Sequence, residues 1–311
     1  MRLLVTGGAG FIGSHVAAAF LGAGHEVLVL DDLSAGDRAN VPAGVRFVQI
    51  DLCDRAAVRG AVEAFRPEAV NHHAAQTNLR FSVEHPIADA RANVLGTVHV
   101  LEAALAVAAR HFLYASTGGA IYGEPDRLPA DEATPVQPLA PYGFHKFLGE
   151  EVLRLVGSHG KISTCILRYG NVYGPRQNPK GEAGVVAIFA TQLLRGERPT
   201  IFGDGTKTRD YVFVADVVRA NLLAMEKAPP GARYNIGTGQ PTTDQRIFDL
   251  VRAAVGSDRE PMYGSKRPGE VDHIWLDCNR AERELGWFPE VPLEEGIKRA
   301  AAFYRGQAGH K

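Results

Sequence analysis

Cysteine is scarce in this sequence, and the three that occur, Cys53, Cys165 and Cys278, stand far apart. An odd number of cysteines without a CxxC pair argues against a disulfide framework and against a zinc cage. Long hydrophobic runs are missing as well, since no segment approaches the roughly 18 to 20 apolar residues that cross a bilayer. The chain opens at once with a β-rich segment and no signal peptide, so we expect a cytoplasmic protein without a membrane partner.

An excess of charge of one sign is also missing. The 34 Lys and Arg residues nearly balance the 35 Asp and Glu residues, which gives a formal net charge of −1. Such a chain has no basic field that would attract nucleic acid or an anionic membrane, so any recognition of phosphate must be local. Lone histidines serve packing or the surface more often than metal binding, and we predict no metal site.

The first half of the sequence contains two kinds of segment in regular alternation. Short β-rich runs alternate with helical patterns, which is typical of parallel βαβ units. Most of the β-rich runs are almost continuously apolar, so we expect helices on both faces of one sheet. The expected strands are Leu3–Thr6, Glu26–Asp31, Val45–Asp51, Ala69–Ala74, His111–Thr117 and Lys161–Tyr169, and the expected helices are Phe11–Leu21, Ala57–Phe65, Asn93–Ala108 and Tyr142–Val156.

The pattern changes after about Asn171. Gly, Pro and Asn are dense in Tyr173–Glu182, which predicts a loop. Helical patterns then mix with short extended pieces, and 211–239 resembles a helix and a strand that return to the main sheet. We therefore expect a doubly wound parallel sheet in residues 1–171, with 211–239 returning to it, and a smaller α/β portion in 172–210 and 240–311. The helices Val185–Leu194, Arg246–Val255 and Leu293–Tyr304 are expected in the smaller portion, and the extended piece Arg233–Gly237 is expected within the returning segment.

A glycine-rich turn lies between the first expected strand and helix. Gly7 allows the tight turn, Gly10 lets the backbone approach a pyrophosphate, and Gly13 permits close packing of helix on strand. The N-terminus of the helix offers free N–H groups to phosphates. Asp31 ends the next strand, where a carboxylate accepts hydrogen bonds from ribose hydroxyls and repels a 2′-phosphate. These features predict a Rossmann-type domain that binds NAD rather than NADP.

A tyrosine and a lysine four residues apart, Tyr142 and Lys146, follow Pro141. On a helix this spacing places both side chains on one face, and proline suits the first position of a helix. A free tyrosine has a pKa near 10 and is a poor base at neutral pH. A nearby ammonium favours the phenolate, and so does the positive nicotinamide of an oxidised cofactor. The pair therefore predicts a general base that removes a proton from a sugar hydroxyl.

Five segments together resemble the extended short-chain dehydrogenase/reductase family, in its NAD-dependent epimerase/dehydratase group, and are most similar to the UDP-glucose 4-epimerases within it. They are Thr6–Gly13, Ser116–Gly123, Tyr142–Lys146, Arg168–Gln177 and Arg209–Tyr211. The resemblance extends from Arg2 to about Tyr304. It implies NAD as cofactor, a UDP-sugar as substrate, and a homodimer that forms through Asn93–Ala108 and Tyr142–Val156.

The resemblance also implies the site residues. Tyr142 and Lys146 match the catalytic pair, Thr117 matches the hydroxyl residue that positions the substrate, and Ser116 is the second choice for that hydroxyl. Alternatively Ser116 and Thr117 only cap a strand, Asp51 caps a helix and Asn93 is a buried structural amide. The implied cofactor-binding residues are Gly7, Gly10, Phe11, Ile12, Gly13, Asp31, Asp32, Ser34, Gly36, Asp51, Leu52, Ala74, Ala75, Gln76, Asn93, Tyr142, Lys146 and Tyr169.

On the substrate side the resemblance implies Thr117, Tyr142, Asn171, Arg209 and Arg267. Planar guanidinium groups grip phosphate oxygens bidentately, although an exposed ion pair is the ordinary role of a single arginine. Ile274 resembles the position that limits bulk beside the sugar ring. His73 and His145 depart from the family pattern, and the sequence suggests no role for them.

We therefore expect NAD-dependent 4-epimerisation of a UDP-hexose, UDP-glucose or UDP-galactose, through a 4-keto intermediate. A 4-epimerase of UDP-GlcNAc or UDP-glucuronate stays open, because the size of the pocket decides between these sugars. A sugar-nucleotide 4,6-dehydratase is less favoured, since Gly118, Gly119 and Ala120 after Thr117 cannot transfer a proton. A dinucleotide-binding protein without catalysis is the remaining alternative.

Overall fold

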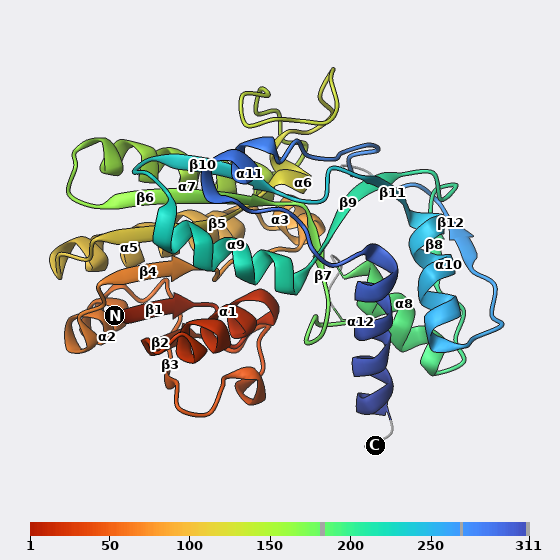
Figure 1. Ribbon diagram of the computed structural model, residues 1–311, viewed down its shortest axis with the longest axis horizontal. Coiled ribbons are helices and arrows are strands. Elements are labelled where there is room, and N and C mark those ends of the chain that lie inside the picture. Colours follow the sequence, from red (N-terminus) through yellow and green to blue (C-terminus); the bar gives the residue numbers. More distant parts are fainter. Residues whose placement is uncertain (181–183, 268–269, 309–311) are drawn as a thin grey trace.

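The centre of the protein is a seven-stranded sheet in the order β3-β2-β1-β4-β5-β6-β10 (Figure 1). Every neighbouring pair of these strands is parallel. The computed structural model describes residues 1–180, 184–267 and 270–308. The strands are β1 (Arg2–Thr6), β2 (Glu26–Asp31), β3 (Arg46–Gln49), β4 (Ala69–His72), β5 (His111–Thr117), β6 (Ser163–Tyr169) and β10 (Ala232–Ile236).

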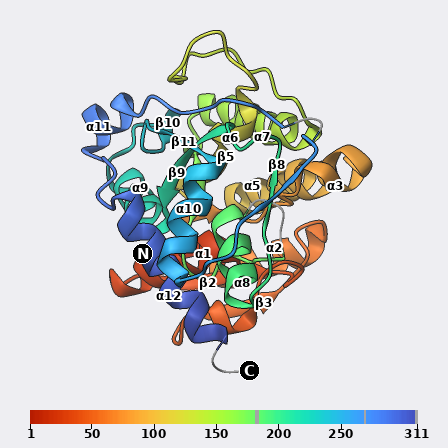
Figure 2. The same ribbon diagram turned by 90° about the vertical axis from the view of Figure 1, so that its right-hand side faces the viewer.

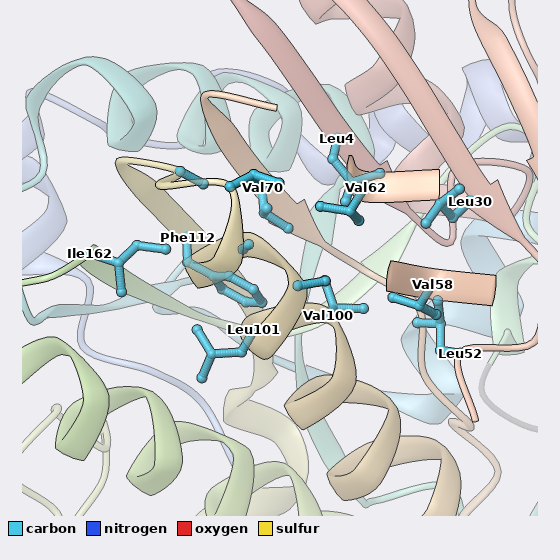
Figure 3. Packing of buried hydrophobic residues seen from close by; sticks show 14 of the residues in the cluster. Leu4, Leu30, Leu52, Val58, Val62, Val70, Val100, Leu101, Phe112 and Ile162 are labelled. Carbon is cyan, nitrogen blue, oxygen red and sulfur yellow. The ribbon is translucent and has the colours of Figure 1, made fainter. Parts of the chain in front are cut away.

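Helices cover both faces of this sheet. One face packs against α2 (Arg55–Phe65), α5 (Gly96–Ala106) and α7 (Pro141–Ser158), and Figure 3 shows Leu4 and Phe112 on this side. The opposite face packs against α1 (Phe11–Gly22) and α9 (Val214–Lys227). Alternate residues of each strand point to opposite faces, so strands covered on both sides are apolar almost throughout.

A second group of elements follows β6. In it β9 (Thr208–Phe213) lies between β7 (Asn171–Tyr173), which is parallel to it, and β11 (Pro241–Thr243), which is antiparallel. A parallel pair is formed by β8 (Thr200–Phe202) and β12 (Met262–Gly264). Three helices pack together beside these strands, at the right of Figure 1 and facing the viewer in Figure 2. They are α8 (Val185–Leu194), α10 (Asp244–Val255) and α12 (Leu293–Ala308).

The remaining elements of the described residues are short helices. Asn78 caps α3 by accepting a hydrogen bond from the backbone N–H of Phe81, and Pro86 stands in the first turn of α4. α3, α4 and η2 all pack against α7. The short helices are η1 (Arg38–Asn40), α3 (Leu79–Glu84), α4 (Pro86–Ala90), η2 (Arg91–Leu95), α6 (Gly118–Ile121) and α11 (Asn279–Leu285).

The expected fold class is confirmed, and the differences concern the bounds of elements. β3 and β4 are shorter than expected, and the expected helix Asn93–Ala108 divides into η2, which has π-helical geometry, and α5. The hydroxyl of Thr97 donates to the carbonyl of Asn93 at 2.8 Å, so this carbonyl bonds a side chain within the irregular turn. Tyr173 belongs to β7 instead of the expected loop, and residues 181–182 of that loop lie outside the described residues.

Among the described residues, no helix has both the length and the apolar character that crossing a membrane requires.

Candidate active site

A cavity of about 1080 Å³ runs from the glycine-rich turn after β1 to the segments around α8, β8 and β9. The order of the sheet reverses between β1 and β4, and doubly wound sheets bind ligands in the crevice at such a point. Pockets for a single drug-sized ligand measure roughly 300 to 1,000 Å³. The cavity is therefore large enough for two ligands side by side, one at the sheet and one at the C-terminal elements.

The glycine-rich turn forms a close-fitting cradle at one end of the cavity. Gly7 has a φ of +68°, and a Cβ there would lie 2.6 Å from the backbone nitrogen of Ala74. A Cβ on Gly13 would overlap the carbonyl oxygen of Gly7. Gly10 precedes α1 as its N-cap residue and borders the cavity. The backbone and the helix N-terminus therefore face a space that a pyrophosphate fits.

Asp31 is held at the edge of this cradle by two backbone hydrogen bonds. Its Oδ2 accepts from Ala9 at 2.9 Å, and its Oδ1 accepts from Leu33 at 2.9 Å. Each carboxylate oxygen can accept a further hydrogen bond, so the group remains available to ribose hydroxyls. The other expected cofactor residues of this half that border the cavity are Phe11, Ile12, Asp32, Ser34, Gly36, Asp51, Leu52, Ala74, Ala75 and Gln76.

Asn93 is the exception among the expected cofactor residues, because it does not border the cavity. It is only 1% exposed, its Oδ1 accepts from the backbone N–H of Gln76 at 3.0 Å, and its Nδ2 donates to the carbonyl of Gln76 at 2.9 Å. The side chain therefore braces the segment that borders the cavity and touches no part of the space itself. The alternative of a buried structural amide describes this position.

Tyr142 and Lys146 both border the cavity from the first two turns of α7. Thr117, at the end of β5, donates a hydrogen bond to the phenol of Tyr142. Burial raises the pKa of Tyr142 above its ordinary value, the charge of Asp89 raises this pKa further, and the bond from Thr117 lowers it. In the protein alone the phenol is thus protonated at neutral pH, and its ionisation requires added positive charge.

The ammonium of Lys146 lies over the ring of Tyr114. Its side chain is almost fully buried, and its Nζ lies 4.0 Å from the centre of the Tyr114 ring. Burial lowers the pKa of Lys146 to about 7, against the opposing charges of Glu150 and Asp89. A lysine with this pKa changes charge close to neutral pH, as perturbed groups at functional sites commonly do.

Ser116 borders the cavity, and its hydroxyl is engaged by a carboxylate of α7. Its hydroxyl donates to Oε1 of Glu150 at 2.5 Å, and Glu150 also forms a fully buried ion pair with Arg168 at 2.6 Å. Glu150 stands four residues after Lys146 on the same face of α7, so helical spacing could have pointed to it. This network connects β5, β6 and α7, and the sequence did not predict it.

His73, which the sequence left without a role, packs on Tyr169 at the wall of the cavity. The two rings are stacked with their centres 6.0 Å apart, and Nε2 of His73 lies 3.2 Å from the hydroxyl of Tyr169. Burial, with a smaller effect of Lys146, lowers the pKa of His73 to about 3. The imidazole is therefore neutral at any working pH and adds no charge beside the cofactor site.

Three of the five expected substrate residues come from segments that follow β6. The guanidinium of Arg209 donates to the carbonyls of Thr208, Val271 and Asp272, which uses three of its five N–H groups and leaves two. Arg267 lies over the ring of Phe202, 3.4 Å from its centre. Asn171, Arg209 and Arg267 all border the cavity.

Ile274 does not border this cavity. It is 1% exposed and packs against Ile121 and Tyr122.

Comparisons with known proteins agree with this geometry. The model of the "NAD dependent epimerase/dehydratase family" matches residues 3–237. A putative UDP-glucose 4-epimerase of Methanocaldococcus jannaschii is 46% identical over 96% of each chain, and a UDP-glucose 4-epimerase of Mycolicibacterium smegmatis is 43% identical over 99% of this chain and 100% of its own.

Solved structures are equally similar. The UDP-glucose 4-epimerase of Thermotoga maritima, determined with UDP-glucose, has a TM-score of 0.97 and 44% identity over 99% of this chain and all of its own. That of Thermus thermophilus, in complex with NAD, has a TM-score of 0.95 and 43% identity over 98% of this chain and 99% of its own. The family model covers most of the sequence, and this chain belongs to the NAD-dependent epimerase/dehydratase family.

Proposed function

We propose that this protein is an NAD-dependent UDP-hexose 4-epimerase that interconverts UDP-glucose and UDP-galactose through a 4-keto intermediate. The observation that carries the proposal is that Tyr142, Thr117 and Lys146 border the same cavity as a dinucleotide cradle and the two arginines Arg209 and Arg267. The names of the relatives and the ligands bound in the two solved structures support it.

The cofactor fits the cradle of the first half. In our proposal the turn Gly7–Gly13 holds the pyrophosphate, Asp31 accepts from the ribose hydroxyls, and Asp51 with Leu52 borders the adenine. Bound NAD supplies a reversible two-electron oxidation of the sugar alcohol. Residues 1–171 and 211–239 would form this half, and 172–210 with 240–311 would hold the sugar nucleotide.

Tyr142 is the proposed base. Its phenolate takes the proton of the C4 hydroxyl and gives it back after the sugar has turned. Because burial and Asp89 oppose ionisation of the phenol, the positive charges of the oxidised nicotinamide and of Lys146 must favour it. Thr117 donates a hydrogen bond to the phenol and can hold the reacting oxygen both as alcohol and as ketone, because a hydroxyl donates and accepts.

The diphosphate anchors the substrate while the sugar turns. Among the described residues, carbonyls engage three of the five N–H groups of Arg209, and Arg267 borders the same cavity. In our proposal both guanidinium groups bind the phosphate oxygens and Asn171 lies beside them. Binding energy from this remote part of the substrate keeps the intermediate in place.

The alternatives differ in what the site must contain. A 4,6-dehydratase needs an acid and a base beside the sugar, and Gly118, Gly119 and Ala120 offer neither. Epimerases of UDP-GlcNAc or UDP-glucuronate differ in the room around the sugar, so substrate comparison separates them from our proposal. A binding protein without catalysis would not need the pair of Tyr142 and Lys146.

One assay tests the proposal. Purified protein is incubated separately with UDP-glucose, UDP-GlcNAc and UDP-glucuronate, and the C4 isomers are separated by chromatography. We expect the isomer of UDP-glucose in the highest yield, without net reduction of NAD. We expect the variant Tyr142→Phe to keep its NAD and to lose roughly 10²- to 10⁴-fold in turnover. Unchanged turnover in this variant, or no isomer of any of the three sugars, would refute the proposal.

We also propose that the protein forms a homodimer. A cytoplasmic location stays a prediction of the sequence. α4 and α7 contact each other, and both carry large apolar side chains at the surface. Ile87 on α4 is 74% exposed, and Phe144 and Leu155 on α7 are about half exposed. A second copy of the chain that covers these side chains would remove them from water.

A further inference from the structure

His145 directly precedes Lys146 on α7, yet its side chain does not border the cavity. Its Nδ1 lies 2.5 Å from Oδ2 of Asp89 on α4. The imidazole is 12% exposed and the carboxylate is fully buried. A carboxylate that loses water in this way requires hydrogen-bond donors, and the ring of His145 is one of them.

The other oxygen of Asp89 leads back to the cofactor half of the cavity. Its Oδ1 accepts from Nε2 of Gln76 at 2.5 Å and from Nδ2 of Asn93 at 3.1 Å. Gln76 borders the cavity, and Asn93 braces its backbone. Asp89 therefore connects the helix that carries Tyr142 and Lys146 to the segment after β4.

The charge of Asp89 acts on both reacting groups. It raises the pKa of Tyr142, and it also raises the pKa of Lys146. The phenol then ionises less readily, while the lysine keeps its charge to higher pH. The effect of Asp89 on these two pKa values depends on how well its hydrogen-bond donors offset the negative charge of its carboxylate. His145 is the titratable group among these donors.

Other charged or titratable groups surround α7, and Asp89 is the ion-pair partner of His145 among the described residues. The elements packed against the helix are α3, α4, η2, α5, α6, β5 and β6. The groups that these elements and α7 itself carry are Arg80, Glu84, Asp89, Arg91, His99, Glu102, His111, Tyr114, Tyr142, Lys146, Glu150, Glu151, Arg154, Cys165, Arg168 and Tyr169.

We infer that His145 is a positioning residue of the epimerase reaction, which compensates Asp89 through its Nδ1–H and so sets the pH range in which Tyr142 acts as a base. The inference depends on the proposed function for its reaction. It assigns a role to a histidine that stands outside the cavity and touches neither substrate nor cofactor. The charges of His145 and Asp89 predict the direction in which each substitution shifts the pH profile. This direction distinguishes a positioning role from simple packing.

The test compares pH profiles of turnover with UDP-glucose for five NAD-loaded proteins. Three are wild type, His145→Leu, which cannot donate, and His145→Asn, whose amide nitrogen takes the place of Nδ1. The fourth is Asp89→Asn, which removes the negative charge. The fifth, Arg154→Gln, breaks an exposed ion pair with Glu151 elsewhere on α7 and serves as control.

We expect the profile of His145→Leu to move to higher pH by about one unit, which is tenfold in turnover on its acid limb. We expect Asp89→Asn to move both limbs to lower pH, because Tyr142 and Lys146 then lose the same negative neighbour. His145→Asn and Arg154→Gln should keep the wild-type profile. Shifts of His145→Leu and Asp89→Asn in the same direction, or no shift in either, would overturn the inference, since lost packing alone produces no opposite signs.

A second readout does not depend on turnover. The ring carbons of tyrosine are labelled with ¹³C, the signal of Tyr142 is assigned by its absence in Tyr142→Phe, and its onset of titration is compared among the NAD-loaded variants. An earlier onset in Asp89→Asn and a later one in His145→Leu support the inference even if UDP-glucose is not the substrate. If His145→Leu does not fold, the test rests on Asp89→Asn. If the Tyr142 signal of Asp89→Asn begins to titrate at the wild-type pH or above it, the inference is contradicted.

Discussion

At the scale of single residues, the hydroxyls of Thr117 and Ser116 have different partners although they are neighbours. Thr117 donates to the phenol of Tyr142, whereas Ser116 donates to the buried carboxylate of Glu150. Successive side chains of a strand point to opposite faces, so only one of the two can face the cavity fully. The sequence places both hydroxyls among its candidates, and in our proposal Thr117 holds the reacting oxygen while Ser116 supports α7 through Glu150.

The two hydroxyls therefore respond differently to removal. Thr117→Val keeps the shape of the side chain and loses a hydrogen bond to a group that becomes charged, which is worth about 1.5 to 3 kcal/mol. We expect turnover to fall roughly 10- to 100-fold, with the melting temperature nearly unchanged. Ser116→Ala should cost about 1.5 to 3 kcal/mol of stability, because its hydroxyl donates to a charged carboxylate, and should leave turnover within a few-fold. A greater loss of turnover in Ser116→Ala than in Thr117→Val would contradict these roles.

Asp31 is the residue that selects the cofactor in our proposal. Both of its oxygens are held by backbone N–H groups, so the negative charge has a fixed place at the rim of the cradle. We expect Asp31→Asn to weaken NAD binding by about tenfold and to raise the affinity for NADP relative to NAD, because the repulsion of a 2′-phosphate is removed. Fluorescence titration with both dinucleotides measures the change.

Asp37 provides the control for this prediction. Its carboxylate is exposed, caps η1 and does not border the cavity. Asp37→Asn should leave both affinities as they are. Equal losses in the two variants would show that Asp31 acts only by holding its loop.

At the scale of elements, the cradle depends on how closely α1 approaches β1. Gly13 faces the carbonyl of Gly7, and a Cβ at that position has no space. Gly22, at the other end of the same helix, has open space around it. Substitutions at Gly13 and Gly22 therefore distinguish the effect of close packing from the effect of backbone entropy.

Alanine at these two positions should therefore change stability in opposite directions. We expect Gly13→Ala to destabilise the protein by about 1 to 3 kcal/mol through overpacking, and to release NAD. Gly22→Ala should be neutral or stabilise the protein by up to about 1 kcal/mol, because alanine favours the helix. Thermal unfolding and the amount of bound cofactor are measured together. A stable Gly13→Ala variant that retains NAD would refute this account of the turn.

At the scale of the whole molecule, α4 and α7 carry large apolar side chains that are exposed to solvent. Ile87 is the most exposed large apolar side chain among the described residues, at 74%. Its helix contacts α7, which also carries Tyr142 and Lys146. An interface here would therefore lie directly behind the candidate active site.

We expect wild type to sediment as a dimer and Ile87→Glu to sediment as a monomer, because the substitution places a charge in an apolar contact. Sedimentation velocity across a range of concentrations gives the state of each protein. Phe288→Glu is the matched control, since Phe288 is 52% exposed on a different part of the surface and should not affect association. A monomeric wild type, or a dimer that persists in Ile87→Glu, would exclude this interface.

The sequence by itself determined the features that depend on near neighbours in the chain. The strand, glycine turn and helix at 2–22 and the spacing of Tyr142 and Lys146 follow from local geometry, and the expected fold class and family are confirmed. The continuous apolar strands also required helices on both faces, as observed.

Only the tertiary structure decided which polar groups meet across the chain. Asp89 reaches His145 56 residues later, and Glu150 reaches Arg168 on another element. Asn93 lies behind the wall of the cavity instead of at it because its amide bonds the backbone of Gln76. Such pairs depend on the angles at which packed helices present their side chains, and no periodicity in one segment records those angles.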